Sequence, residues 1–269
     1  MIILIFAVAV GCGAFAALHY AADWGLAWSI VAGVASFGVF QAAVGYMVQK
    51  RIKREMEKVQ EILVAGQKKL QQKMQRWQLR QPGSIQAAQK EIAEDTKVFV
   101  RQAIEQTKSL ERFRLFVPMM GRQIATARLQ LSWMVKDFKT VDELMPKALL
   151  IDPTMCAMKM ARLYMLDKPM SEIEKVYRKG AARVRYNGNV LLAAAMSWMQ
   201  VKKGDADGAF KTLTDALKKS DNAVLKQNHE QLMNNRVSHF TNSGLGDQWY
   251  SLLLEEPKVK AQRQRSFYR

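Results

Sequence analysis

The 269-residue chain is poor in the residues that build disulfide frameworks and metal sites. It has two cysteines, Cys12 and Cys156, and three histidines, His19, His229 and His239. One cysteine lies inside an apolar segment and the other in the charged remainder, so we expect no pairing between them. The histidines do not combine with Cys156 into a metal-ligand spacing. We therefore expect no disulfide framework, no metal and no cofactor.

Catalytic motifs are also missing from the sequence. It has no glycine-rich loop for a phosphate, no Walker motif and no dinucleotide fingerprint. His229-Glu230 lacks the second histidine of a zinc-protease motif, and Cys156 lies in a methionine-rich stretch where a buried thiol is the simpler role. We therefore expect that the protein is not an enzyme.

Charge is almost absent from the first 49 residues, which hold only Asp23. Residues 1–18 and 25–48 are apolar, and each segment approaches or exceeds the roughly 20 residues that cross about 30 Å of hydrocarbon. The short connector, residues 19–24, forces the two segments to run antiparallel. It has no Lys or Arg, whereas ten follow by residue 80. The positive-inside rule thus predicts a two-pass transmembrane hairpin (1–48), with the bulk of the chain in the cytoplasm.

Two other interpretations of the first segment stay open. A cleaved signal peptide normally begins with positive charge, and no Lys or Arg precedes this apolar run. A lipid-modified Cys12 has a suitable Gly11 before it, but Ala9 stands where such signals usually have Leu. Small residues at four-residue spacing predict close packing of the two segments; these are Ala9, Gly13 and Ala17 in the first, and Ser29 and Gly33 in the second.

Residues 49–81 contain no proline and one glycine, Gly66. Apolar side chains follow spacings of four and three as far as Leu70, which is the period of a coiled-coil seam. We therefore expect the second apolar helix to continue as a charged stalk. Pro82 and Gly83 are expected to end the stalk helix in a turn. Ser84 is the predicted N-cap of another helix, which ends near Phe113. The region 49–120 is predicted to be a juxtamembrane helical stalk or hairpin.

The net charge of +17 is concentrated in two stretches. Residues 50–80 carry +7 and the tail, residues 257–269, carries +5, whereas residues 81–256 carry +6 and Asp23 subtracts one. This distribution fits an anionic membrane surface better than a nucleic-acid channel. The residues expected to contact such a surface are Lys50, Arg51, Lys53, Arg54, Arg263 and Arg265. The basic tail is predicted to be flexible.

Three alanines, Ala148, Ala182 and Ala216, are separated by 34 residues. They lie in the segments VDELMPKALLIDP, SEIEKVYRKGAARV and ADGAFKTLTDALKKSD, each of which can form a helix. With this period, residues 121–221 resemble the tetratricopeptide repeat (TPR) family. The third unit matches best, with Gly204 at its interhelix turn. The middle unit matches least, which indicates that the register of the repeat shifts near Lys168.

The resemblance implies a stack of about three helix-turn-helix units whose first helices line a concave groove for a partner peptide. Gln130, Trp133, Tyr164 and Trp198 would face that groove, and residues 222–256 would form capping helices. An ordinary helical bundle with an accidental alanine period is the alternative. The overall layout also resembles bacterial membrane-anchored TPR proteins, which implies a bacterial-type inner (plasma) membrane.

The predicted fold class is all-α: a transmembrane helical hairpin, a long stalk and a TPR-like α-solenoid. The predicted function is that of a membrane-anchored cytoplasmic scaffold or adaptor that recruits a protein partner through the concave face of its repeats. One alternative is a structural subunit of an oligomeric membrane assembly, in which stalks self-associate as coiled coils. Another is a binder of anionic lipid or, less favoured, of nucleic acid through the basic stretches.

Overall fold

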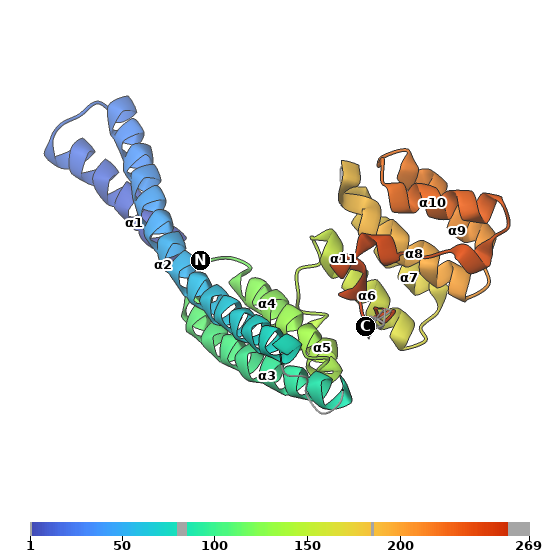
Figure 1. The fold of residues 1–269 in the computed structure, drawn as a ribbon. Coiled ribbons are helices and arrows are strands. Elements are labelled where there is room, and N and C mark those ends of the chain that lie inside the picture. Colours follow the sequence, from blue (N-terminus) through green and yellow to red (C-terminus); the bar gives the residue numbers. More distant parts are fainter. Residues whose placement is uncertain (1, 80–84, 184–185, 258–269) are drawn as a thin grey trace. The chain divides into compact units, whose positions relative to one another are not determined.

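A computed structural model describes residues 2–79, 85–183 and 186–257, and all regular elements in these ranges are helical (Figure 1). This confirms the all-α prediction. The chain divides into two compact units, Met1–Ala148 and Leu149–Arg269, each described by itself. The boundary falls inside the predicted repeat region. The predicted N-cap Ser84 and the predicted tail contacts Arg263 and Arg265 lie outside the described residues.

The first unit begins with an apolar hairpin, residues 2–48. Helix α1 (Ile2–Ala16) and the π-helical turn η1 (Ala17–Ala21) lead into α2 (Leu26–Leu79). Both helices are long and apolar enough to cross a membrane. A Cβ on Gly11 would lie 3.0 Å from the Gly33 carbonyl oxygen, and one on Gly33 would lie 2.9 Å from that of Gly11. The close approach thus uses Gly11; the predicted Gly13 faces open space.

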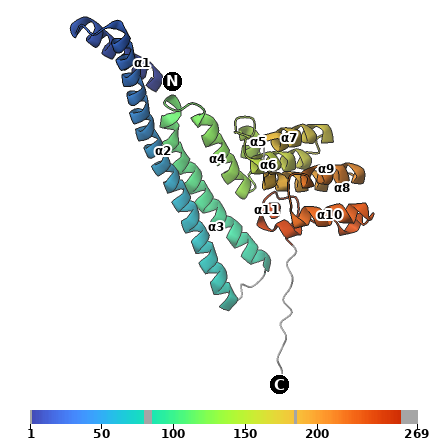
Figure 2. The same cartoon turned by 90° about the horizontal axis from the view of Figure 1, so that it is seen from above.

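Helix α2 runs for 54 residues without a break, which confirms that the second apolar segment continues into the charged stalk. Helix α3 (Ile85–Gln106) and the 3-10 helix η2 (Thr107–Leu115) return antiparallel beside it (Figure 2). Lys73 pairs with Asp95 and Glu91 near the far end of this stalk hairpin. The apolar seam is covered within the chain, because Val59, Ile62, Leu63 and Leu70 pack with Phe99, Val100 and Ala103.

A polar cluster around Glu55 joins α2 to the end of α3. The Glu55 carboxylate accepts hydrogen bonds from Ser109 Oγ (2.9 Å) and Gln106 Nε2 (3.0 Å), and forms ion pairs with Lys58 (3.1 Å) and Arg112 (3.0 Å). The hydrogen bonds from Ser109 and Lys58 lower the pKa of Glu55 against the opposing effect of burial. A lowered pKa means that folding favours the ionised carboxylate, so the cluster stabilises the stalk hairpin.

We expect Glu55→Gln to lower the stability of the protein at neutral pH by about 1–2 kcal/mol, because the amide cannot satisfy four donors. Since folding lowers this pKa, its contribution is complete above the ordinary Glu value of 4.5 and is lost as pH falls through the lowered value. Thermal unfolding in detergent, followed by circular dichroism, should show the variant's deficit at pH 7 and a smaller one near pH 4. Glu57→Gln is the control, because Glu57 is exposed and its ion pair with Lys53 is long, at 3.9 Å. An equal deficit for both variants would contradict the role of the cluster.

Helices α4 (Met120–Met134) and α5 (Phe138–Leu144) complete the first unit. Leu131 of α4 joins the cluster of Val59 and Phe99, so α4 packs on the stalk hairpin. Helix α5 ends at Leu144; Met145 keeps helical dihedral angles, and Pro146 has no N–H to continue the hydrogen-bond ladder. Ala148, predicted to lie on this helix, therefore falls beyond its end.

The second unit consists of short helices around a buried central one. In chain order they are α6 (Pro153–Met165), α7 (Met170–Arg183), η3 (Tyr186–Asn189), α8 (Val190–Lys202), α9 (Ala206–Leu217), α10 (Ala223–Met233), η4 (Val237–His239), η5 (Ser243–Leu245) and α11 (Asp247–Tyr250). Every residue of α8 from Leu191 to Gln200 is buried, so this helix forms the core of the unit. The predicted helix after Asp221 is α10, and Asn222 caps it by accepting from the N–H groups of Val224 and Leu225.

One turn recurs after α4, α6, α8 and α10. In each case a left-handed residue follows the helix, namely Lys136, Asp167, Gly204 and Asn235. The next N–H bonds back to a carbonyl in the last turn: Asp137 to Ser132, Lys168 to Leu163, Asp205 to Gln200 and Arg236 to Gln231. This is the pattern of a Schellman motif. The chain therefore repeats one helix-ending structure across both units.

The spacing of these turns shows where the register of the repeat shifts near Lys168. The turns at Lys136 and Gly204 are 68 residues apart, twice the alanine period of 34, while Asp167 comes 31 residues after Lys136. The middle turn is therefore three residues early. In agreement, Ala182 is exposed and Gly180 takes the buried small position of α7, where an added Cβ would lie 3.2 Å from Cys156 Cβ.

Candidate partner-binding site

The structure brings two of the four predicted groove residues together. Tyr164 of α6 and Trp198 of α8 meet edge to face with ring centroids 5.5 Å apart. Tyr164 is half-buried, whereas Trp198 is only 6% exposed. Two lysines follow the rings, with Lys202 over Trp198 and Lys203 over Tyr164. We call the Tyr164 and Trp198 rings, together with the two lysines over them, the aromatic cluster.

The C-terminal segment of the second unit covers this aromatic cluster. Trp249 packs on Trp198 with ring centroids 5.7 Å apart. Glu255 accepts a 2.8 Å hydrogen bond from each indole N–H, that of Trp198 and that of Trp249. A carboxylate between two buried indoles satisfies both of their donors. The face predicted to hold a partner peptide is thus occupied around Trp198 by the protein's own residues.

A buried amide network holds the same C-terminal segment in place. Asn228 of α10 donates to Asn242 Oδ1 (2.8 Å), and Asn242 donates to the carbonyl of Ala194 in α8 (2.9 Å). Asn228 also accepts from the backbone N–H of Thr241 (3.0 Å). Both asparagine side chains are fully buried. Because each bond lies away from water, the network fixes residues 241–242 against the core.

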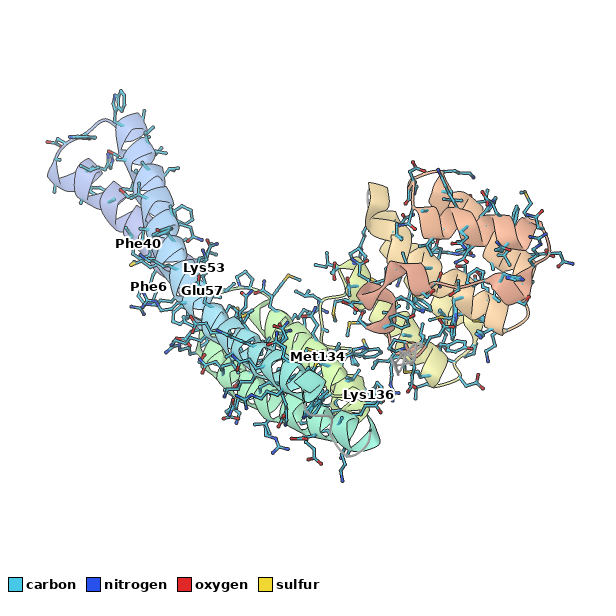
Figure 3. All side chains as sticks on the ribbon, viewed as in Figure 1. Phe6, Phe40, Lys53, Glu57, Met134 and Lys136 are labelled. Carbon is cyan, nitrogen blue, oxygen red and sulfur yellow. The ribbon has the colours of Figure 1, made fainter. Side chains whose placement is uncertain are left out.

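The other two predicted groove residues, Gln130 and Trp133, lie on α4 in the first unit. Gln130 is exposed. Trp133 is 3% exposed and packs edge to face on Phe138 of α5 at 5.7 Å. Figure 3 shows Met134 and Lys136 at the end of this helix, where the turn to α5 begins. The Trp133 ring therefore joins α4 to α5.

An open groove lies on the opposite side of α8 from Trp198. Helices α7 and α9 form its walls, Met196 and Gln200 of α8 contribute to its floor, and its volume is about 700 Å³. Tyr177 of α7 and Thr212 of α9 also line it, and Thr212 donates to Gln200 Oε1 (2.9 Å). We call it the α7–α9 groove. Sequence patterns missed it because its walls come from second helices, outside the predicted concave face.

The α7–α9 groove contains an unsatisfied acceptor. Asn189 is 4% exposed, and its side-chain oxygen has no hydrogen-bond partner among the described residues. Buried polar atoms without partners are rare and costly. The rim has mixed charge, with Glu174 near Arg178 (3.3 Å), Asp215 near Lys218 (2.7 Å), and exposed Lys211 and Lys219.

Burial shifts the pKa of two groups in the second unit, Tyr177 and Cys156. Burial, reinforced by Asp215, raises the pKa of Tyr177, so its phenol stays protonated at neutral pH. Burial likewise raises the pKa of the Cys156 thiol, which disfavours the nucleophilic thiolate. Within the described ranges, no group of three His, Cys, Asp or Glu side chains is placed to hold a metal ion. The groove offers an open cavity and a charged rim for binding.

The residues predicted to contact an anionic surface lie on α2 as it leaves the apolar hairpin. Lys50, Arg51, Lys53 and Arg54 are all exposed. Figure 3 shows Phe6 and Phe40 close together in the hairpin, with Lys53 and Glu57 farther along α2. A second basic cluster, missed from sequence, surrounds the junction of η2 and α4 in the same unit. Its signal was the run from Arg112 to Arg122, in which arginines enclose apolar residues.

Comparisons with known proteins give no family: no protein-family model, curated protein or solved structure matches this chain.

Proposed function

We propose that this protein is a membrane-anchored scaffold that holds a segment of a protein partner in its α7–α9 groove. The observation that carries the binding proposal is the open α7–α9 groove itself, with Met196 and Gln200 in its floor and charged residues on its rim. Stacked helical hairpins commonly bind partner peptides on their concave face; here the open groove lies between second helices instead. The four recurring turns support the TPR-like interpretation of the repeats.

The exposure of the apolar hairpin supports the anchoring part of the proposal. Only 11% of the most apolar window of the first helix and 6% of that of the second are buried. A core helix of a soluble protein would be mostly buried, and an exposed apolar surface of this size would cause aggregation in water. The Gly11–Gly33 contact supports a hairpin that is retained whole over a cleaved first segment. We place the hairpin in the plasma membrane, with residues 50–269 on the cytoplasmic side.

Self-association through the stalk is the weaker candidate. The seam residues that would face a second chain, including Val59, Leu63 and Leu70, already pack against α3 and α4. A coiled coil with another copy would have to displace those helices. A scaffold needs no such rearrangement, because the α7–α9 groove is open as it stands.

The binding proposal can be tested by reversing charge at the groove rim. We expect Lys211→Glu with Lys219→Glu to abolish recovery of the partner protein that co-purifies with the intact chain from detergent-solubilised membranes. The control is Lys175→Glu with Lys179→Glu, which makes the same charge change at exposed positions of α7 that do not line the groove. A photo-crosslinking residue in place of Thr212 would identify proteins that enter the groove. Equal recovery with both double variants would refute groove binding.

A further inference from the structure

The connection from η2 to α4 exposes a group of large apolar side chains. Leu115 is 64% exposed, Phe116 is 37% exposed and Met119 is 55% exposed. With Val117 and Pro118 they form what we call the apolar loop, residues 115–119. Arg114 precedes it and Arg122 follows it. A group of exposed apolar side chains flanked by arginines marks a candidate contact surface.

Packing within the first unit places the apolar loop beside the start of the charged stalk. Leu110, Phe113, Met120 and Ile124, which flank the loop, form one cluster, and Val48 and Ile52 of α2 pack against it. The antiparallel register agrees: Ser109 lies opposite Glu55, so continuing along η2 brings Leu115 opposite residues 47–49. Figures 1 and 2 both show the junction of α3 and α4 near the N-terminal end of α1.

This position is where the apolar hairpin ends. Gly11 lies opposite Gly33, so the antiparallel register brings Ile2 opposite Ala42. The exposed Tyr46 follows, and Lys50 and Arg51 are the first basic residues of α2. At 1.5 Å per residue, residues 47–49 are within about 5 Å of Tyr46 along the helix axis. Aromatic and basic residues in this order mark the interface between hydrocarbon and lipid headgroups.

A basic pocket lies directly behind the apolar loop. Arg114, Met119, Arg122, Arg128 and Lys147 are among its lining residues, and its volume is about 790 Å³. Its one acidic residue, Glu111, pairs with Arg128 at 2.7 Å. The lining therefore carries an excess of positive charge. Guanidinium groups bind phosphate oxygens with two parallel hydrogen bonds, which suits a lipid headgroup.

We propose that the apolar loop inserts into the cytoplasmic face of the bilayer, with Leu115, Phe116 and Met119 at the level of the upper acyl chains and Arg114 and Arg122 on lipid phosphates. This inference rests on the proposed membrane anchor and adds a third, non-spanning membrane contact. The contact would hold the α2–α3–α4 stalk at a set angle to the membrane. The level of the loop along α2 and its arginines favour lipid over a second protein as the covering surface.

Depth-dependent fluorescence quenching tests this inference on the full chain. The protein is reconstituted into phosphatidylcholine/phosphatidylglycerol vesicles that contain nitroxide-labelled lipid, with an environment-sensitive dye on one cysteine. The exposed native Cys12 reports the anchor, and the buried Cys156 is replaced by Ala. In a Cys12→Ser background, Phe116→Cys reports the apolar loop. Gln89→Cys is the control, since this exposed residue of α3 lies roughly 40 Å farther along the stalk.

We expect strong quenching at positions 12 and 116 and none at position 89. Quenching at 116 should come mainly from nitroxides near the headgroup and should fall when Arg114→Glu and Arg122→Glu are added. Quenching at 12 without quenching at 116 would refute the loop insertion while the anchor stands. Absence of quenching at 12 would refute the anchor, and with it this inference. Quenching at 116 that is unchanged by the arginine substitutions would overturn the assignment of those arginines to lipid phosphate.

Discussion

A chain that lacks residues 2–44 should leave the membrane fraction and stay folded. The deletion removes most of the apolar hairpin but keeps Val48 and Ile52, which pack against Leu110, Phe113, Met120 and Ile124. A transmembrane helix inserts almost irreversibly, so its removal should shift the protein from membrane pellet to supernatant. Fractionation with an alkaline carbonate wash measures this shift, and circular dichroism measures the helix content of the released chain.

The intact protein is the control and should resist the carbonate wash. A weak, salt-sensitive association of the shortened chain fits the proposed contact of Arg114 and Arg122 with lipid phosphate, because such contacts are screened by ions. Full retention of the shortened chain after both carbonate and high salt would contradict the anchoring role of the hairpin.

Trp198→Ala should unfold much of the second unit at temperatures where the intact protein is stable. Truncation of a buried tryptophan typically costs about 3–5 kcal/mol. Here it would also remove the Tyr164 and Trp249 ring contacts and one of the two indole donors to Glu255. Since domains of this size are stable by only about 5–15 kcal/mol, the expected loss is severe. Thermal unfolding followed by tryptophan fluorescence and circular dichroism would measure it.

Trp198→Phe provides the matched variant for this prediction. It keeps a ring in the aromatic cluster and loses the N–H, so we expect a smaller cost of about 1–3 kcal/mol. Gln130→Ala, at an exposed residue of α4, should leave stability unchanged. If Trp198→Ala has the same unfolding temperature as the intact protein, the C-terminal segment does not depend on Trp198. The prediction that Trp198 lines a partner-binding groove would then be favoured again.

The anchor-like part of the fold follows closely from the sequence, because its signals are local. A run of 49 residues with one charge predicts two apolar helices. The absence of proline from residues 49 to 81 predicts that the second of them continues into the stalk. Gly204, predicted at an interhelix turn, has the positive φ of such a turn, whereas the cap Asn222 of α10 was not predicted. These features depend on neighbours within a few residues.

The candidate site depends on contacts between distant residues, which a single sequence does not reveal. Trp198 and Glu255 are 57 positions apart, and a buried amide network fixes part of the segment between them against the core. The repeat period pointed to Ala182, yet a middle turn three residues early places Gly180 in the core. The protein's own C-terminal segment occupies the surroundings of Trp198, and the open groove lies on the other side of α8.

The topology of the hairpin is the central claim, and thiol labelling in intact cells tests it most directly. In a chain with Cys12→Ser and Cys156→Ala, one cysteine is placed either at Ala22 in the connector or at Gln89 on α3, both exposed. A membrane-impermeant maleimide should label position 22 in intact cells and position 89 only after lysis. Labelling of position 89 in intact cells, or of position 22 only after lysis, would contradict a hairpin that carries the helical scaffold on the cytoplasmic face.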